Sequence, residues 1–363
     1  MPIREESFRI GCGRYIQGKG YISRCGEEVL RLGRSPMVIG DETTIAVTRE
    51  KLESSLGASC NKYEIIIHNG TCNDERATEL ADYAKANGYD VIIGVGGGVI
   101  MDFAKLCAHF AELPVINIPT SSATCAAYAP LSVRYTVEGK TVGSKHYERE
   151  VNAVIADTEI IGAQPVRLLL SGVFDALAKF IEIKQRFNES TENYPMGLDY
   201  AYVLSRRSYD VLNSRISGCI EAMKRGEITE DTDQVIFTAI AATGVISGIA
   251  RGSNQCALAH KFYETTRTLF PESARPYLHG EIVGIGLLLQ NRFNGEEENN
   301  TSLLALMRAH NMPCKITDVG IDPSVETFEK YYEMLKNSSA IESDNTDECR
   351  RLREGLTYLW GIK

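Results

Sequence analysis

Four kinds of pattern are missing from this sequence, and each absence argues against a class of protein. The ten cysteines are scattered and form no C-x-x-C pair. The formal net charge is −9, and no block of Lys and Arg is long enough to follow a polyanion. A nucleic-acid partner is therefore not expected.

The sequence also shows neither an export signal nor a long apolar run. The amino terminus, MPIREESFRIG, is charged and has no apolar core segment. No later run reaches the roughly 18 to 20 apolar residues that span a bilayer. Scattered cysteines without a signal favour reduced thiols. We expect a cytoplasmic protein with no membrane partner.

The sequence does contain short apolar runs that alternate with helical patterns. A helix is predicted over Asp74–Gly88, with small apolar residues on one face and Gly88 as its stop. Runs of a length suited to buried strands are Met37–Gly40, Glu64–His68, Val91–Val95 and Val115–Ile118. This alternation predicts right-handed crossovers and a parallel sheet.

The hydrophobic pattern changes after about Asp157, where long apolar or amphipathic stretches replace the strand-like runs. Examples are Val173–Arg186, Asp233–Ile249 and Glu281–Arg292. A chain of 363 residues is long enough for two domains. We expect an α/β domain with a parallel sheet over residues 1–160 and an all-α domain over residues 161–363.

Four glycines lie between a strand and a helix in VIIGVGGGVIMDFAKL, which begins at Val91. This order suits a backbone that cups phosphate. It is not the G-x-G-x-x-G pattern, because the last glycine is replaced by Val99, and no P-loop Lys follows. Two alternatives stay open: a tight turn with glycines only for packing, and a surface ion pair between Asp102 and Lys105.

Asp175, His260 and His279 each interrupt an apolar stretch. A divalent cation would satisfy all three and leave one coordination position for substrate. The local alternatives are an i,i+4 ion pair between Asp175 and Lys179 and ordinary core histidines. That ordinary class is assigned to the other four: His68, His109, His146 and His310.

Several of these stretches together resemble a known family. GVGGGVIMDFAK is similar to the GGG-x-x-x-D-x-x-K signature of the glycerol dehydrogenase branch of the metal-dependent, iron-type alcohol dehydrogenases, related in fold to dehydroquinate synthase. Further stretches match in order from about residue 36 to 290: VIGDETTI, IPTSSATCAAYAPLSVRYT, VIADTEII, GVFDALAKFIE and YLHGEIVGIG.

The resemblance implies a dinucleotide-binding domain followed by a helical, metal-binding domain. It implies that Asp175, His260 and His279 bind the metal, and that Asp41 binds the adenosine ribose and favours NAD over NADP. The other implied cofactor contacts are Gly96, Gly97, Gly98 and Asp102 around the pyrophosphate, with Thr120, Ser121, Leu131 and Tyr135 along the cofactor.

Three departures from the family pattern bear on the metal and the substrate. Iron-dependent members have a fourth ligand, His, where this chain has Lys179, which favours zinc; iron, nickel and manganese stay open. Cys125 replaces the Asp that faces a polyol, and a thiol accepts hydrogen bonds poorly. Arg251 and Asn254 stand where either an anion site or a helix cap is possible.

The resemblance implies an NAD-linked alcohol or polyol oxidoreductase, glycerol dehydrogenase-like, that transfers hydride from a zinc-bound alkoxide to NAD. No side chain is identified as a catalytic base, and a homo-oligomer is expected. The competing interpretations are an sn-glycerol-1-phosphate dehydrogenase, a dehydroquinate synthase-like lyase and a non-catalytic NAD-binding relative.

Overall fold

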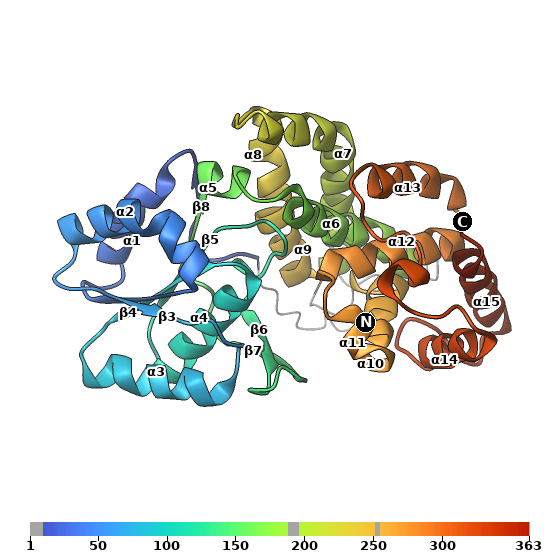
Figure 1. Ribbon diagram of the computed structural model, residues 1–363, viewed down its shortest axis with the longest axis horizontal. Coiled ribbons are helices and arrows are strands. Elements are labelled where there is room, and N and C mark those ends of the chain that lie inside the picture. Colours follow the sequence, from blue (N-terminus) through green and yellow to red (C-terminus); the bar gives the residue numbers. More distant parts are fainter. Residues whose placement is uncertain (1–9, 188–195, 251–254, 363) are drawn as a thin grey trace. The chain divides into compact units, whose positions relative to one another are not determined.

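The computed structural model describes residues 10–187, 196–250 and 255–362 (Figure 1). They form two compact units. The first contains residues 10–165 and 213–245, and the second contains residues 166–212 and 246–362. The segment 213–245, which lies in the helical half expected from sequence, thus packs with the first unit.

The first unit is built on a six-stranded sheet in the order β1-β8-β5-β4-β2-β3, and all of its pairs are parallel. The strands are β1 Tyr15–Gly18, β2 Pro36–Gly40, β3 Glu64–Ile67, β4 Val91–Gly96, β5 Val115–Pro119 and β8 Ala153–Asp157. The central strands are buried on both faces, so they are continuous apolar runs. The four predicted strands are β2 to β5.

Helices cover both faces of this sheet (Figure 1). On one face lie the 3₁₀ turn η1 Tyr21–Arg24, α1 Cys25–Leu30 and α2 Glu42–Ser59; on the other lie α3 Asp74–Ala86 and α4 Gly98–Ala111. Side chains alternate along each strand, so Val38 packs with the first group while Met37 and Ile39 pack with the second. The expected helix is α3, and its buried face is the predicted one.

The order of the strands reverses between β2 and β4. From β2 the chain passes through α2 to β3 on one side, and then returns through α3 to β4 on the other side of β2. In open α/β sheets, ligands bind at such a switch point, outside the carboxyl ends of the strands. The residues that follow β2 and β4 therefore lie at the edge where sheets of this kind bind ligands.

A hairpin and several short helices complete the first unit. The hairpin pairs β6 Leu131–Tyr135 with β7 Thr141–His146, and β6 lies against α4. The helices are α5 Thr158–Gly162, α8 Glu230–Phe237 and the π-helical turn η2 Thr238–Ala242.

Two helices cross from one unit to the other: α7 Met196–Lys224 and α9 Thr243–Ile249. The other helical segments of the second unit are α6 Val166–Phe187, α10 Leu258–Leu269, α11 Pro271–Ala274, α12 His279–Asn294, η4 Glu297–Asn299, α13 Asn300–Ala309, η5 Ile316–Val319, α14 Val325–Lys336 and α15 Thr346–Trp360.

Helix α12 is the buried centre of this unit and packs against α6, α10 and α15. Its glycines permit the close approach. A Cβ at Gly280 would lie 1.8 Å from the Ser171 carbonyl oxygen of α6, and one at Gly286 would lie 2.6 Å from the Ala259 carbonyl oxygen of α10. Three helices are thereby brought together.

One helix bears on the expectation that no segment spans a membrane. The continuous helix Glu230–Ile249 is long and apolar enough to cross a membrane by length and composition alone. However, 56% of its apolar window is buried inside the protein. Packing within the fold accounts for its apolar character.

Candidate metal and dinucleotide sites

The three predicted metal ligands come from three packed helices. Asp175 lies in the middle of α6, His260 in the first turn of α10, and His279 is the first residue of α12. The Ser171 hydroxyl accepts a hydrogen bond from the Gly280 N–H, which fixes the start of α12 against α6. Packing therefore brings together residues 85 and 104 positions apart in the chain (260 − 175, 279 − 175).

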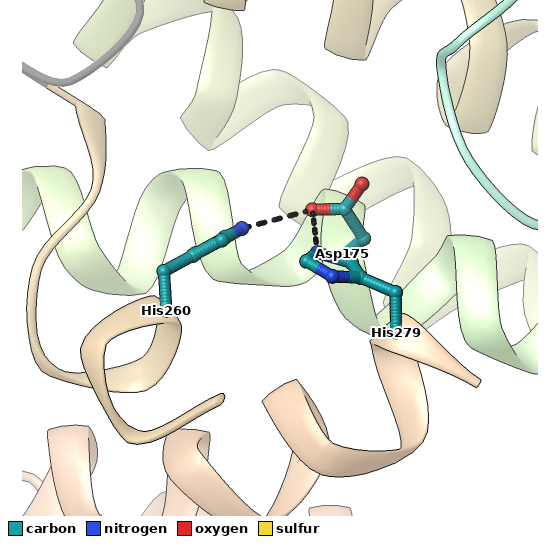
Figure 2. Close-up of side chains that lie close together, drawn as sticks. All are labelled: Asp175, His260 and His279. Carbon is teal, nitrogen blue, oxygen red and sulfur yellow. Dashed lines mark ion pairs between the residues drawn. The ribbon is translucent and has the colours of Figure 1, made fainter. Parts of the chain in front are cut away.

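Both imidazoles face one carboxylate oxygen (Figure 2). Nε2 of His260 lies 3.3 Å from Oδ1 of Asp175, and Nε2 of His279 lies 3.7 Å from the same atom. One potential ligand atom from each residue lies within 4.8 Å of the other two. Asp175 and His260 are buried, while the side chain of His279 is 27% exposed and gives the group its open side.

Two further charged residues complete this cluster, and both come from the same face of α6. The Lys179 ammonium lies 2.9 Å from Oδ1 of Asp175 and 3.5 Å from Nε2 of His260. The Glu182 carboxylate contacts Nδ1 of His260 at 2.5 Å. The ion pair weighed as an alternative for Asp175 is thus present together with the three-residue cluster.

Glu182 was not assigned a role from sequence, although its i+7 spacing from Asp175 on a helix was a usable signal. It is fully buried. Besides the imidazole, its Oε1 accepts the backbone N–H groups of Ala257 and His260, at 2.8 and 2.9 Å. It therefore caps α10 and orients His260 at once.

The charged groups of this cluster shift one another's pKa values. Burial alone would raise the pKa of Asp175, but the Lys179 ammonium and the two nearby imidazoles hold it well below its usual range. Burial lowers the pKa of His279, which favours its neutral form. Burial also opposes protonation of His260, yet Cys256 and Glu182 leave its pKa well above the usual value. A metal ion at Nε2 of His260 would compete with a proton for that nitrogen.

The glycine run serves two purposes. Gly94 and Gly96 are needed for packing, because a Cβ there would lie 2.6 Å from Cβ of Ala104 and 2.8 Å from Cβ of Ile100. Gly97 is different, since the nearest atom to a Cβ would be 3.8 Å away. It precedes the first residue of α4, Gly98, and makes no side-chain cap. The amide groups of the first turn of α4 are thus open to an anion.

Asp41 follows β2, next to the strand that carries the glycines. Gly40 pairs with Val95, so Asp41 is level with Gly96 at the switch point of the sheet. Its Oδ1 accepts the Thr44 N–H at 2.9 Å and caps α2. The structure thereby brings Asp41 and the glycine run to one edge, as a shared dinucleotide site requires.

The surface-pair interpretation of Asp102 and Lys105 is wrong, because both side chains are buried. Their ion pair measures 2.9 Å. Asp102 also accepts the Val133 N–H at 2.9 Å, and Lys105 donates to the carbonyl oxygens of Ala126, Ala129 and Leu131. Burial raises the pKa of Asp102 against the opposing effect of Lys105. The Asp102–Lys105 pair therefore fixes residues 126–133, which include the first residues of β6, against α4.

The remaining predicted cofactor residues lie along the same unit. The Thr120 N–H donates to the Gly96 carbonyl, and the Ser121 hydroxyl faces Gly97. Leu131 and Tyr135 begin and end β6, which lies on α4. Cys125 is half-buried, and its carbonyl accepts the N–H groups of Tyr128 and Ala129 in a turn.

Arg251 and Asn254, weighed as an anion site or a helix cap, lie outside the described residues.

Comparison with known proteins identifies the family. The model of the iron-containing alcohol dehydrogenases matches residues 12–158. A glycerol dehydrogenase from Escherichia coli O6:H1 is 31% identical over 316 residues, which cover 86% of this chain and 84% of that protein. The chain belongs to the iron-containing alcohol dehydrogenase family.

Two more comparisons agree with this membership. A glycerol dehydrogenase from Thermotoga maritima is 31% identical over 280 residues, 76% of this chain and 74% of that protein. The crystal structure of glycerol dehydrogenase from Schizosaccharomyces pombe is 23% identical and has a TM-score of 0.82, covering 98% of this chain and 90% of that one. At this identity the likeness shows the fold. The predicted family and fold class are confirmed.

As a member of the iron-containing alcohol dehydrogenase family, the chain is an alcohol oxidoreductase, and the family implies NAD and a metal. The residues fit a divalent ion. One carboxylate and two imidazoles converge, and Glu182 binds Nδ1 of His260 so that Nε2 faces Asp175. A carboxylate behind the imidazole is the usual support of a metal-binding histidine.

Proposed function

We propose that this protein is a zinc-dependent, NAD-linked polyol or alcohol dehydrogenase of the glycerol dehydrogenase type, with Asp175, His260 and His279 as the metal ligands. The observation that carries the proposal is the convergence of their ligand atoms within 4.8 Å. Two imidazole nitrogens and one carboxylate oxygen form a catalytic zinc set, which leaves one coordination position for substrate.

Bound cofactors would supply the reaction chemistry: a metal ion at Asp175, His260 and His279 would supply Lewis acidity toward the substrate oxygen, and NAD would supply the hydride acceptor. The chain supplies position and charge. Glu182 holds the His260 ring, and Ser171 and the helix packing hold His279. The partly exposed side of His279 is where a small alcohol would enter.

The dinucleotide is assigned to the switch point of the sheet. The open amide groups at Gly97 and Gly98 suit the diphosphate, and Asp41, on the neighbouring strand, suits the ribose hydroxyls of NAD. Asp102 supports this site by holding Val133, in β6, on α4. Thr120, Ser121, Leu131 and Tyr135 as cofactor contacts, and Cys125 as a substrate contact, belong to the same proposal.

The test combines metal analysis with a substrate panel. We expect the purified protein to contain about one zinc ion per chain and to form NADH steadily from NAD and glycerol or another diol. Asp175→Asn should lose the metal and the turnover while keeping NADH binding. Zinc-loaded protein that binds NADH but turns over no alcohol would contradict the proposal and indicate a non-catalytic relative.

Two further interpretations have their own outcomes in this assay. A clear preference for dihydroxyacetone phosphate over dihydroxyacetone would indicate an sn-glycerol-1-phosphate dehydrogenase. Recycling of NAD without steady NADH formation would indicate a lyase. Homo-oligomeric assembly and a cytoplasmic location stay predictions.

A further inference from the structure

The Lys179 ammonium contacts Oδ1 of Asp175, the oxygen that a metal ion in this cluster would bind. Lys179 is 4% exposed, and its ammonium is 2.9 Å from Oδ1 of Asp175, the oxygen that both imidazoles face. The same ammonium is 3.5 Å from Nε2 of His260. The positive charge of Lys179 is thus inside the three-residue cluster rather than beside it.

The charge balance of the cluster accounts for this position. Two carboxylates are buried there, but Glu182 is already satisfied by the His260 ring and by the backbone N–H groups of Ala257 and His260. Asp175 has Lys179 as its closest cationic partner among the described residues. Without that ammonium or a metal ion, Asp175 would be a buried carboxylate whose nearest polar neighbours are the two imidazoles, at 3.3 and 3.7 Å.

A divalent ion and the Lys179 ammonium would repel each other if both bound this oxygen. An ion bound to Oδ1 of Asp175 and to Nε2 of His260 would lie beside Nζ of Lys179, where repulsion between like charges is strong because the site is buried. An ion bound to Asp175 and His260 would therefore have to displace the Lys179 ammonium from Asp175.

We propose that Lys179 is an internal cation that competes with the metal for Asp175. Two consequences follow: the centre binds its ion more weakly than the same ligands would with a neutral residue at position 179, and the metal-free protein keeps its stability because the ammonium replaces the ion. This inference rests on the proposed metal site and deepens it.

The test compares Lys179→Met with the unchanged protein and with Lys184→Met. Methionine has a similar length and no charge. Lys184 is a matched control, because it lies on the same helix, pairs with Glu296 and is outside the cluster. The measurement is the zinc dissociation constant of chelator-stripped protein, obtained by competition with a chromophoric chelator.

We expect Lys179→Met to bind zinc about tenfold more tightly or better, because it removes a like charge beside the ion in a buried site. Lys184→Met should bind as the unchanged protein does. The melting temperature is a second readout: metal-free Lys179→Met should melt below the metal-free unchanged protein and gain more on zinc addition. If metal-free Lys179→Met does not fold, zinc release to excess chelator from the loaded variant should be slower than from the unchanged protein.

The outcomes separate this inference from the proposed function. Equal or weaker zinc binding by Lys179→Met, with binding by the unchanged protein intact, would overturn the role of Lys179 and leave the metal site standing. No zinc binding by either protein would overturn the metal site itself, and this inference with it.

Discussion

At the scale of single residues, one face of helix α6 organises the polar core of the helical unit. Asp175, Lys179 and Glu182 recur at i, i+4 and i+7, so all three side chains point to the same side of the helix. One carboxylate meets the two imidazoles directly, while the other supports His260 from behind. A single helical stripe thus supplies a ligand, a counter-charge and an orienting group.

Removing the orienting carboxylate should weaken metal binding. Gln in Glu182→Gln keeps the shape of the side chain and can still accept one N–H, but it removes the charge behind Nδ1 of His260. We expect zinc affinity to fall about 10- to 100-fold. Titration calorimetry would measure it, with Glu264→Gln, an exposed change on α10, as the control. Unchanged affinity would show that Glu182 only caps α10.

A buried histidine in the other unit should make stability depend on pH. The His68 ring stacks on Phe103 with centroids 3.7 Å apart, and its Nε2–H donates to the Thr71 carbonyl at 3.0 Å. Burial lowers the pKa of this ring below its usual 6.5. Below about pH 6.5 the unfolded chain therefore takes up a proton that the folded ring refuses, and stability is lost as pH falls.

The expected result is a difference between variants. Between about pH 7.5 and 5.5, the melting temperature of the unchanged protein should fall by a few degrees more than that of His68→Gln, as measured by circular dichroism. His146→Gln, on the exposed hairpin, should follow the unchanged protein. Parallel curves for all three proteins would mean that His68 takes up its proton in the folded state.

At the scale of elements, a substitution in the β4–α4 turn should weaken NADH binding without lowering the stability of the fold. Gly97 has ordinary negative φ and open space at its Cβ position, so Gly97→Ala should fold normally. Its methyl group would stand among the amide groups offered to the diphosphate. We expect NADH to bind about tenfold more weakly, a loss of about 1.4 kcal/mol, by fluorescence titration. Unchanged NADH affinity would show that the diphosphate does not bind at the start of α4.

Two other glycines give the contrasting cases. Gly94→Ala would press against Ala104 and should lower the free energy of unfolding by about 1 to 3 kcal/mol. Gly57→Ala lies on an exposed turn of α2 with no atom within 4 Å and should raise it by about 1 kcal/mol. Urea denaturation would measure both. A stable Gly94→Ala variant would show that α4 can shift away from the sheet.

The elements predicted from sequence are those with an unambiguous pattern. Strands β2 to β5 are mostly apolar, and α3 has a clear apolar face. Strand β1, Tyr15–Gly18, was not predicted because its YIQG sequence is short and only half-buried. The burial of Lys105 could not be foreseen either, since its carbonyl partners lie 21 to 26 residues away in a segment without regular pattern.

In the candidate site too, local features could be predicted from sequence, while contacts between distant residues could not. The glycine run is local, so a phosphate-binding turn could be predicted there from the order of strand, turn and helix, with a packing-only turn as the alternative. The metal cluster joins residues 85 and 104 positions apart, and no spacing rule reaches that far, so the family resemblance carried it. The positions of Lys179 against His260 and of Glu182 behind it depend on how α6 and α10 pack, which only the structure gives.

At the scale of the whole molecule, the cysteines are spread over both units and none of them, all described, is joined in a disulfide. All ten lie within the described residues and none forms a disulfide; Cys25, Cys72, Cys107, Cys219 and Cys314 are buried. Burial also raises the pKa of Cys12 to about 11, so thiolate is scarce even at some of the partly exposed positions. The fold therefore depends on packing and not on cross-links.

This arrangement predicts a two-stage thiol titration. With Ellman's reagent near pH 8, the native protein should react at no more than the five partly exposed cysteines, and slowly at Cys12, whereas in denaturant all ten should react. The melting temperature should be the same with and without a reducing agent, because no disulfide is available to lose. Fewer than ten thiols in denaturant, together with a melting temperature that falls on reduction, would show that a disulfide forms in the folded protein.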